Sequence, residues 1–232
     1  MSLTWKQAVK DFETYLRLEK SLSGNSISAY TDDVIKLSRY FGRQNNGRIP
    51  SEVTYNDLRE FIAWYGEGNQ NARTQSRTIS GIRSFFRFLL LEGEIQENPA
   101  ALIESPKIGL KLPEVLSVNE IDRMIDEIDH SRPEGHRTKA MSETLYGCGL
   151  RVSELVNLRL TDVHYGEGFI SVTGKGNKQR LVPISNKALK EIDIYKTGRN
   201  RLPVIQDQNI IFLNRRGKKL TRAMIFIIIK DL

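Results

Sequence analysis

Two short segments in the second half of the chain hold arginine, lysine and glutamate at spacings that suit phosphate chemistry. In the first, GLRVSE (149–154), the arginine stands at a tight turn that enters a helix, and helix N-termini bind anions. Glu154 follows Arg151 by three residues, a spacing at which it can orient the guanidinium. A plain surface pair of these two side chains, which would contribute little stability, fits the same spacing.

The second segment, GKGNKQR (174–180), is a glycine-rich basic stretch between two strand-like runs. Glycine lets the backbone approach a phosphate closely, and Lys175 is placed there as a mobile proton donor. The segment is not a nucleotide-binding P-loop, because its spacing differs and no Ser or Thr follows the lysine. Taken alone, it is best explained as an exposed basic turn.

A third basic feature lies on a helix predicted from near Arg73 to Leu91. No acidic residue occurs between Gly68 and Leu91, whereas the polar positions include Arg73, Arg77, Arg83 and Arg87. Arginines interleaved with small hydroxyl side chains are typical of surfaces that contact DNA phosphates. A solvated basic helix face is the alternative, and the lack of compensating acids favours DNA contact.

Composition and charge narrow the class of protein. The 232 residues carry a net charge of +7 and a pI near 9.5, and +6 of this charge falls after residue 108. Such a domain usually has a polyanionic partner, although a basic protein without one is the alternative. Cys148 is the only cysteine, so no disulfide framework or cysteine-based zinc site is expected. No apolar run reaches the ~20 residues of a membrane span, so we expect no membrane partner. With only one cysteine, we expect a reducing, cytoplasmic setting.

Apolar residues at helical spacing predict four helices in the first hundred residues. Their apolar stripes cover residues 5–16, 27–41, 58–65 and 79–90. Thr54 is the expected N-cap of the third helix, with Asp57 in its first turn. We therefore expect an all-α four-helix domain over 1–98.

A linker is expected over 99–116, where three prolines occur and periodicity is lost. Ser117 and Glu120 then form a capping-box pattern that opens a mixed α+β domain over 117–232. Its expected elements are a helix ending at Gly149, a short helix over 152–158, a β-hairpin with strands over 169–173 and 179–184, a helix near 188–195, a short strand over 210–213 and a final helix capped by Thr221.

Joined together, these segments resemble a known family. YGCGLRVSELVNLRLTDV (146–163) followed by GFISVTGKGNKQRLVPIS (168–185) resembles the catalytic domain of tyrosine site-specific recombinases, the phage integrase family. The likeness is strongest to the bacterial Xer recombinases, which resolve chromosome dimers. FETYLRLEKSLSGNSISAYTDDVIKLSRYF (12–41) resembles the family's helical core-binding, SAM-like domain.

The resemblance implies site-specific DNA recombination or integration through a 3′-phosphotyrosyl intermediate. It implies a double-stranded DNA partner enclosed between two domains, further recombinase protomers in a tetramer on DNA, and no metal or other cofactor. By the same resemblance, Arg151 clamps the phosphate oxygens, Lys175 protonates the leaving 5′-oxygen and Glu154 is a supporting residue. The DNA-binding residues that we expect are Arg73, Arg77, Arg83, Arg87, Lys178 and Arg180.

One part of the family pattern has no match in this sequence. None of the three histidines has an arginine three positions later, so the second box, His-x-x-Arg, is missing, and no tyrosine stands in the context of the nucleophile. We therefore expect a catalytic domain that is truncated at its C-terminal side, and a cytoplasmic, nucleoid-associated chain that binds DNA without cleaving it. A non-catalytic DNA-binding regulator is the main alternative. The paired motifs disfavour a structural helical protein with an unrelated basic domain.

Overall fold

A computed structural model describes residues 3–44, 47–68, 70–109, 112–174, 176 and 178–232. The chain divides into two compact units, Met1–Leu112 and Pro113–Leu232, and each unit has its own buried apolar core. Within the described ranges, no helix combines the length and the apolar character that a membrane crossing requires.

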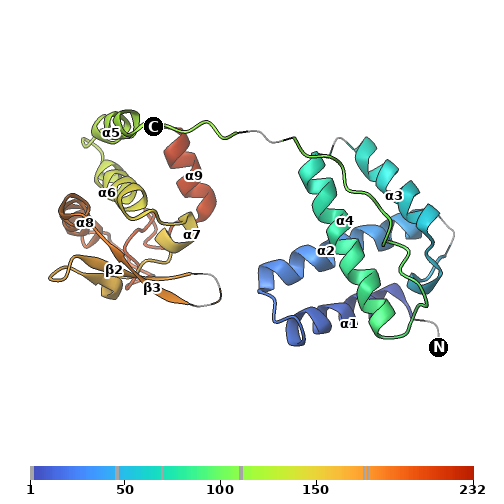
Figure 1. Cartoon of the computed structure of the whole chain (residues 1–232). Helices are drawn as coiled ribbons and strands as arrows, with labels where there is room; N and C mark the ends of the chain where they lie inside the picture. The colour runs from blue at the N-terminus through green and yellow to red at the C-terminus, as the bar shows by residue number, and fades with distance from the viewer. Residues whose placement is uncertain (1–2, 45–46, 69, 110–111, 175, 177) are drawn as a thin grey trace. The chain divides into compact units, whose positions relative to one another are not determined.

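Four α-helices make up the described part of the first unit (Figure 1). They are α1 (Trp5–Leu18), α2 (Gly24–Arg43), α3 (Tyr55–Glu67) and α4 (Ala72–Leu91). Each helix begins after a polar residue whose side chain accepts a hydrogen bond from a backbone N–H of the first turn. These N-cap residues are Thr4, Ser23, Thr54 and Asn71. The predicted four-helix fold and the Thr54 cap are therefore confirmed.

The core of the first unit is rich in aromatic side chains. Phe12, Phe61 and Phe85 are fully buried, and the Trp5 ring stacks on both Phe41 and Phe85 with centroids 5.9 Å apart. Figure 1 shows α4 crossing α2. Aromatic side chains far apart in the sequence meet in this core, as Phe12 and Phe85 do with ring centroids 5.4 Å apart. The burial of several such rings supplies a large share of the unit's hydrophobic stabilisation.

A buried carboxylate joins α2 to α4. The side chain of Asp33 is 1% exposed, and Arg77 Nη1 and Nη2 donate to its two oxygens at 2.7 and 3.0 Å. Thr78 Oγ1 and Lys36 Nζ donate to the same carboxylate at 3.1 and 3.0 Å. Gly81 leaves room for it, because a Cβ atom at that position would lie 2.8 Å from Asp33 Oδ2. The close approach of α2 and α4 here therefore depends on a glycine.

The start of the predicted linker packs on the first unit. Ala100 and Ile103 are buried in the helical core, and the Arg83 guanidinium donates to the main-chain carbonyl of Ile103. The first unit therefore includes residues beyond 98, because these two apolar side chains are buried against its helices.

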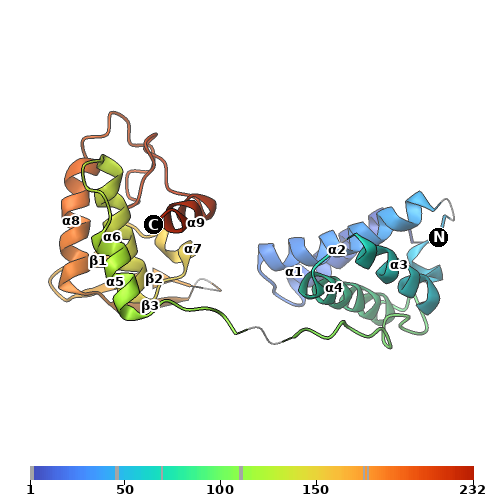
Figure 2. The ribbon, with the colours of Figure 1, turned by 90° about the horizontal axis from the view of Figure 1, so that it is seen from above.

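The second unit combines helices with a small sheet. In the described residues its helices are α5 (Val118–Asp126), α6 (Pro133–Cys148), α7 (Val152–Leu155), α8 (Asn186–Arg199) and α9 (Arg222–Lys230). Strands β1 (Val163–His164), β2 (Phe169–Thr173) and β3 (Gln179–Pro183) pair in that order, and both pairings are antiparallel. Figures 1 and 2 show α5, α6 and α8 side by side. Ile170 and Val172 of the sheet share a buried core with residues of α6 and α8. The prediction of a mixed α+β unit with a β-hairpin is confirmed.

Two details of the second unit differ from the prediction. Helix α7 ends at Leu155 rather than Leu158, because the backbone after it pairs with a distant segment: the Ile211 N–H donates to the Leu158 carbonyl at 3.0 Å. The strand predicted over 210–213 is wrong, because that segment makes only isolated bridges, at Ile210 and Leu213. The final helix is capped by Thr221 as predicted.

We predict that Gly81→Ala destabilises the first unit by about 1–3 kcal/mol, because the added methyl group would meet the buried Asp33 carboxylate. In an open helix the same change stabilises by up to about 1 kcal/mol. Gly42→Ala in α2 is the matched control, since nothing lies within 4 Å of its Cβ position. Urea unfolding followed by tryptophan fluorescence tests this, because both tryptophans, Trp5 and Trp64, belong to the first unit. Equal behaviour of the two variants would contradict the prediction.

Candidate active site and nucleic-acid interface

A sharp turn between α6 and α7 places Arg151. Gly149 ends α6 in the left-handed conformation, with φ of 56°, which glycine adopts without strain. The Leu150 N–H donates back to the Leu145 carbonyl at 3.1 Å and closes the end of α6. Arg151 follows the glycine by two residues and is the residue immediately before α7, which begins at Val152.

Glu154 receives donors from two segments of the chain. The Arg151 backbone N–H donates to Glu154 Oε2 at 2.8 Å, and Arg151 Nη1 donates to Oε1 at 2.9 Å. From β3, Arg180 Nη1 and Nη2 donate to Oε1 and Oε2 at 2.7 and 3.0 Å. Each carboxylate oxygen thus accepts two hydrogen bonds, which fills the acceptor capacity of the group.

The burial of Glu154 rules out a plain surface pair. Its side chain is 3% exposed, whereas that of Arg151 is 68% exposed. The pKa of Glu154 is lowered to about 2, first by the hydrogen bonds from Arg180 and then by those from Arg151, against the opposing effect of burial. The carboxylate therefore stays ionised at neutral pH and holds a guanidinium that remains largely open to solvent.

The basic hairpin begins next to this carboxylate. The Gly174 N–H donates to the Lys178 carbonyl at 2.8 Å and closes the loop. A Cβ atom on Gly174 would lie 3.3 Å from Arg180 Nη1 and 3.5 Å from Glu154 Oε1, so the loop starts in contact with the ionic cluster. Lys175 lies outside the described residues. Lys178 is exposed.

The four arginines of α4 fall into two kinds. Arg73 and Arg87 are exposed and have no ionic partner within the described residues. Arg77 is bound to the buried Asp33 while 46% of its side chain stays exposed, and Arg83 is half-buried on the Ile103 carbonyl. Two of the four arginines are therefore bound to other groups of the protein, a difference that the sequence of α4 does not indicate.

Sequence reasoning missed two basic residues beside this face. Lys36 and Arg39 of α2 line a shallow groove together with Arg77 of α4 and one acidic residue, Asp32. Their i, i+3 spacing on a predicted helix was the signal in the sequence that could have identified them as neighbours on one helix face. Only the packing of α2 on α4 brings them next to the α4 arginines.

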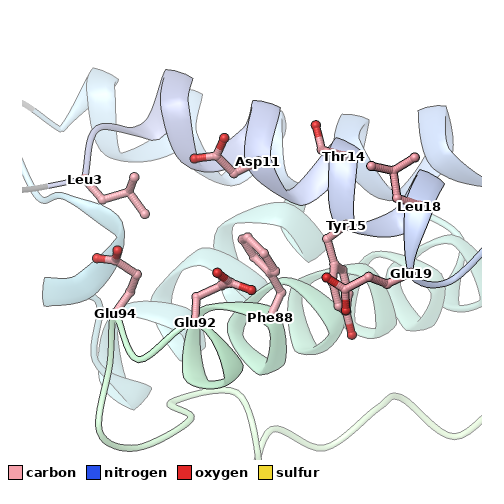
Figure 3. Close-up of a pocket in the computed structure, with 9 residues that line it drawn as sticks. All are labelled: Leu3, Asp11, Thr14, Tyr15, Leu18, Glu19, Phe88, Glu92 and Glu94. Carbon is pink, nitrogen blue, oxygen red and sulfur yellow. The ribbon is translucent and has the colours of Figure 1, made fainter.

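Acidic side chains gather in a different groove of the first unit, between α1 and α4. Figure 3 shows Asp11 and Glu19 from the α1 side, with Glu92 and Glu94 at the end of α4. Leu18 and Phe88 are among the apolar side chains of the same groove. Four carboxylates repel a phosphate backbone, so this groove is not a nucleic-acid interface.

We predict that Glu154→Gln destabilises the second unit by about 1.5–3 kcal/mol at neutral pH, because charge-assisted hydrogen bonds from two arginines are weakened. The folded pKa of about 2 lies below the ordinary value of 4.5, so the ionised carboxylate stabilises the fold above pH 4.5. That contribution is lost as the pH falls from 4.5 towards 2.

Urea unfolding followed by circular dichroism at a series of pH values measures the effect, with the first unit's transition assigned by tryptophan fluorescence. The gap between wild type and Glu154→Gln narrows as the pH is lowered through this window. Glu114→Gln is the control, because Glu114 is exposed. A gap that stays constant down to pH 2 would show that the charge of Glu154 does not contribute.

Known proteins match the chain over nearly its full length. Residues 114–232 match the phage integrase family, and residues 9–93 match the phage integrase N-terminal SAM-like domain. The tyrosine recombinase XerD of Listeria innocua is 35% identical over 226 residues, which are 97% of this chain and 76% of that protein. XerD of Oceanobacillus iheyensis is 36% identical over 228 residues, with the same coverage.

Solved structures share the fold. The XerH site-specific recombinase bound to its difH substrate superposes with a TM-score of 0.73 at 18% identity, over 98% of this chain and 79% of that one. A lambda integrase dimer bound to a core site gives 0.72 at 16% identity, over 99% and 63%. With two matching domain models and relatives at more than a third identity, the chain belongs to the phage integrase family of tyrosine recombinases and is of the Xer type.

Proposed function

We propose that this chain forms the DNA-binding and phosphate-activating part of a recombinase that cuts and rejoins double-stranded DNA at specific sites. The observation that carries the proposal is the Arg151 guanidinium, which is held by a buried carboxylate and still 68% exposed. A fixed donor of this kind stabilises the negative charge that develops on a phosphodiester during substitution. The names of the relatives, tyrosine recombinase XerD, support the same reaction.

In the proposed reaction a tyrosine hydroxyl gives its proton to solvent, and its oxygen bonds to phosphorus while the bond from phosphorus to the 5′-oxygen breaks. This leaves a 3′-phosphotyrosyl link and a free 5′-hydroxyl, and rejoining is the reverse reaction with a second duplex. Arg151 stabilises the non-bridging oxygens, and Lys175 gives a proton to the leaving 5′-oxygen. Glu154 supports Arg151. The covalent link conserves the bond energy, so the proposal needs no nucleotide.

We assign no nucleophile among these 232 residues, because the sequence has no His-x-x-Arg box. The Tyr195 hydroxyl is buried and accepts the Leu213 N–H at 3.0 Å, and the Tyr165 hydroxyl accepts a hydrogen bond from Lys196. We propose that a polypeptide of these residues binds DNA without cleaving it. A non-catalytic regulator that uses the same DNA-binding surfaces is the second candidate, and the missing box is the observation that favours it.

The proposed DNA contacts are the basic side chains that protrude from the first unit and from the hairpin. They are Lys36 and Arg39 of α2, Arg73, Arg77 and Arg87 of α4, and Lys178. Among the structural relatives, XerH is bound to difH, and a lambda integrase tetramer is bound to a Holliday junction. By analogy, the proposed partners are a duplex recombination site and other recombinase protomers, at the nucleoid in the cytoplasm.

We predict salt-sensitive duplex binding, with log affinity falling linearly with log salt by about 0.9 per phosphate contact. Arg73→Gln and Arg87→Gln, combined, reduce both the affinity and the slope, because two phosphate contacts are lost. Arg17→Gln on α1 removes an arginine that pairs with Glu13 and lies outside the proposed contacts, and it leaves both nearly unchanged. Titration of a labelled duplex at several salt concentrations measures this. A flat salt response would refute binding through phosphates.

We predict that the 232-residue polypeptide forms no covalent complex with DNA. A nicked suicide substrate, which traps the covalent link when it forms, should give no shifted band on a denaturing gel. A duplex-binding assay in the same buffer is the positive control for a folded protein. A reproducible adduct would show that one of the tyrosines of this chain acts as the nucleophile.

A further inference from the structure

Arg180 lies on the core side of the hairpin rather than on its outer side. In the register of β2 and β3 it stands opposite Val172, which is 2% exposed. Residues directly opposite each other in an antiparallel pair share a face of the sheet, and the next residue, Leu181, is 64% exposed on the other face. The strand pairing therefore turns Arg180 towards α7 and its buried carboxylate.

The contact that Arg180 makes uses both ends of its guanidinium. Nη1 and Nη2 meet the two oxygens of Glu154 at 2.7 and 3.0 Å, a bidentate fork that fixes the orientation as well as the distance of the two groups. Lysine cannot reproduce it, because an ammonium is a single point of charge. The fork spans 26 positions in the sequence and joins a strand to a helix.

The geometry points to Arg180 as a positioning residue that couples the lysine-bearing hairpin to the Arg151 turn through Glu154. Glu154 is shared, because Oε1 accepts from both guanidinium groups and Oε2 accepts from Arg180 and from the Arg151 backbone. Gly174, the last residue before Lys175, packs on the same cluster. This role rests on the proposed function, in which Arg151 and Lys175 act on one phosphate.

The coupling is asymmetric. Loss of the Arg180 fork removes two of the four donors to Glu154 and frees both the hairpin and the Arg151 turn. Loss of the Arg151 side chain removes one donor and leaves both the fork and the backbone hydrogen bond in place. A direct DNA contact by Arg180, which its charge and its place in a basic loop suggest, would have no such effect on the free protein.

Residue-resolved amide hydrogen exchange by NMR on the free chain tests the inference. In Arg180→Gln, the amides of Arg151 and Gly174 exchange about ten- to a hundred-fold faster, as expected for the loss of a charge-assisted fork. Amides elsewhere in the second unit change less. Arg180→Lys gives intermediate protection. Lys178→Gln, the matched control at an exposed position of the same loop, leaves both amides at wild-type rates while it weakens duplex binding.

Arg151→Ala keeps the Gly174 amide protected, as the asymmetry requires. The inference is overturned if Arg180→Gln leaves the Arg151 amide protected, or if its only effect is the loss of duplex affinity seen with Lys178→Gln. Uniformly faster exchange across the second unit would also overturn it, because Arg180 would then be a general stabilising residue. Failure of wild type to bind duplex DNA would refute the proposed function and leave the exchange result intact.

Discussion

The candidate site depends on one buried carboxylate. An isolated ionised group at the position of Glu154 would be costly to bury, and the four donors from Arg151 and Arg180 offset that cost. Two guanidinium groups share a single negative charge, so the cluster keeps a net positive charge of one. Because Arg151 is the more exposed of the two arginines, this surplus charge is presented to solvent, where a phosphate can meet it.

The first unit also contains a buried carboxylate that binds basic side chains of two helices. Asp33 is buried between α2 and α4, and it gathers Arg77 and Lys36 around one carboxylate. The surplus positive charge again lies at the outer edge of the cluster, in the shallow groove that Arg39 also lines. In each unit, therefore, a buried acid both stabilises the packing of two elements and holds basic side chains in a fixed place. Fixed charges lose less entropy on binding a phosphate than mobile ones do.

Solved recombinases share the fold of this chain at low sequence identity. At 15–18% identity most side chains differ, yet the fold extends over nearly the whole chain. Core positions tolerate exchange among apolar residues of similar volume, whereas a bidentate pair with a buried carboxylate tolerates little. The segments around Arg151 and Arg180 are also among those that carry the family resemblance in the sequence.

Helical periodicity, the caps at Thr54, Ser117 and Thr221 and the glycine-rich hairpin signal were sufficient to determine the helices and the main strands, because each of these features is local. The motif at Arg151 was readable for the same reason. The internal contacts of each basic side chain were decided only by the tertiary structure: Arg83 donates to a main-chain carbonyl and Arg180 to a carboxylate, and neither contact could be predicted from charge. The sequence composition gives only the number of charged side chains. The packing of the elements determines which of these side chains bind a partner inside the protein and which remain exposed to solvent or to a phosphate.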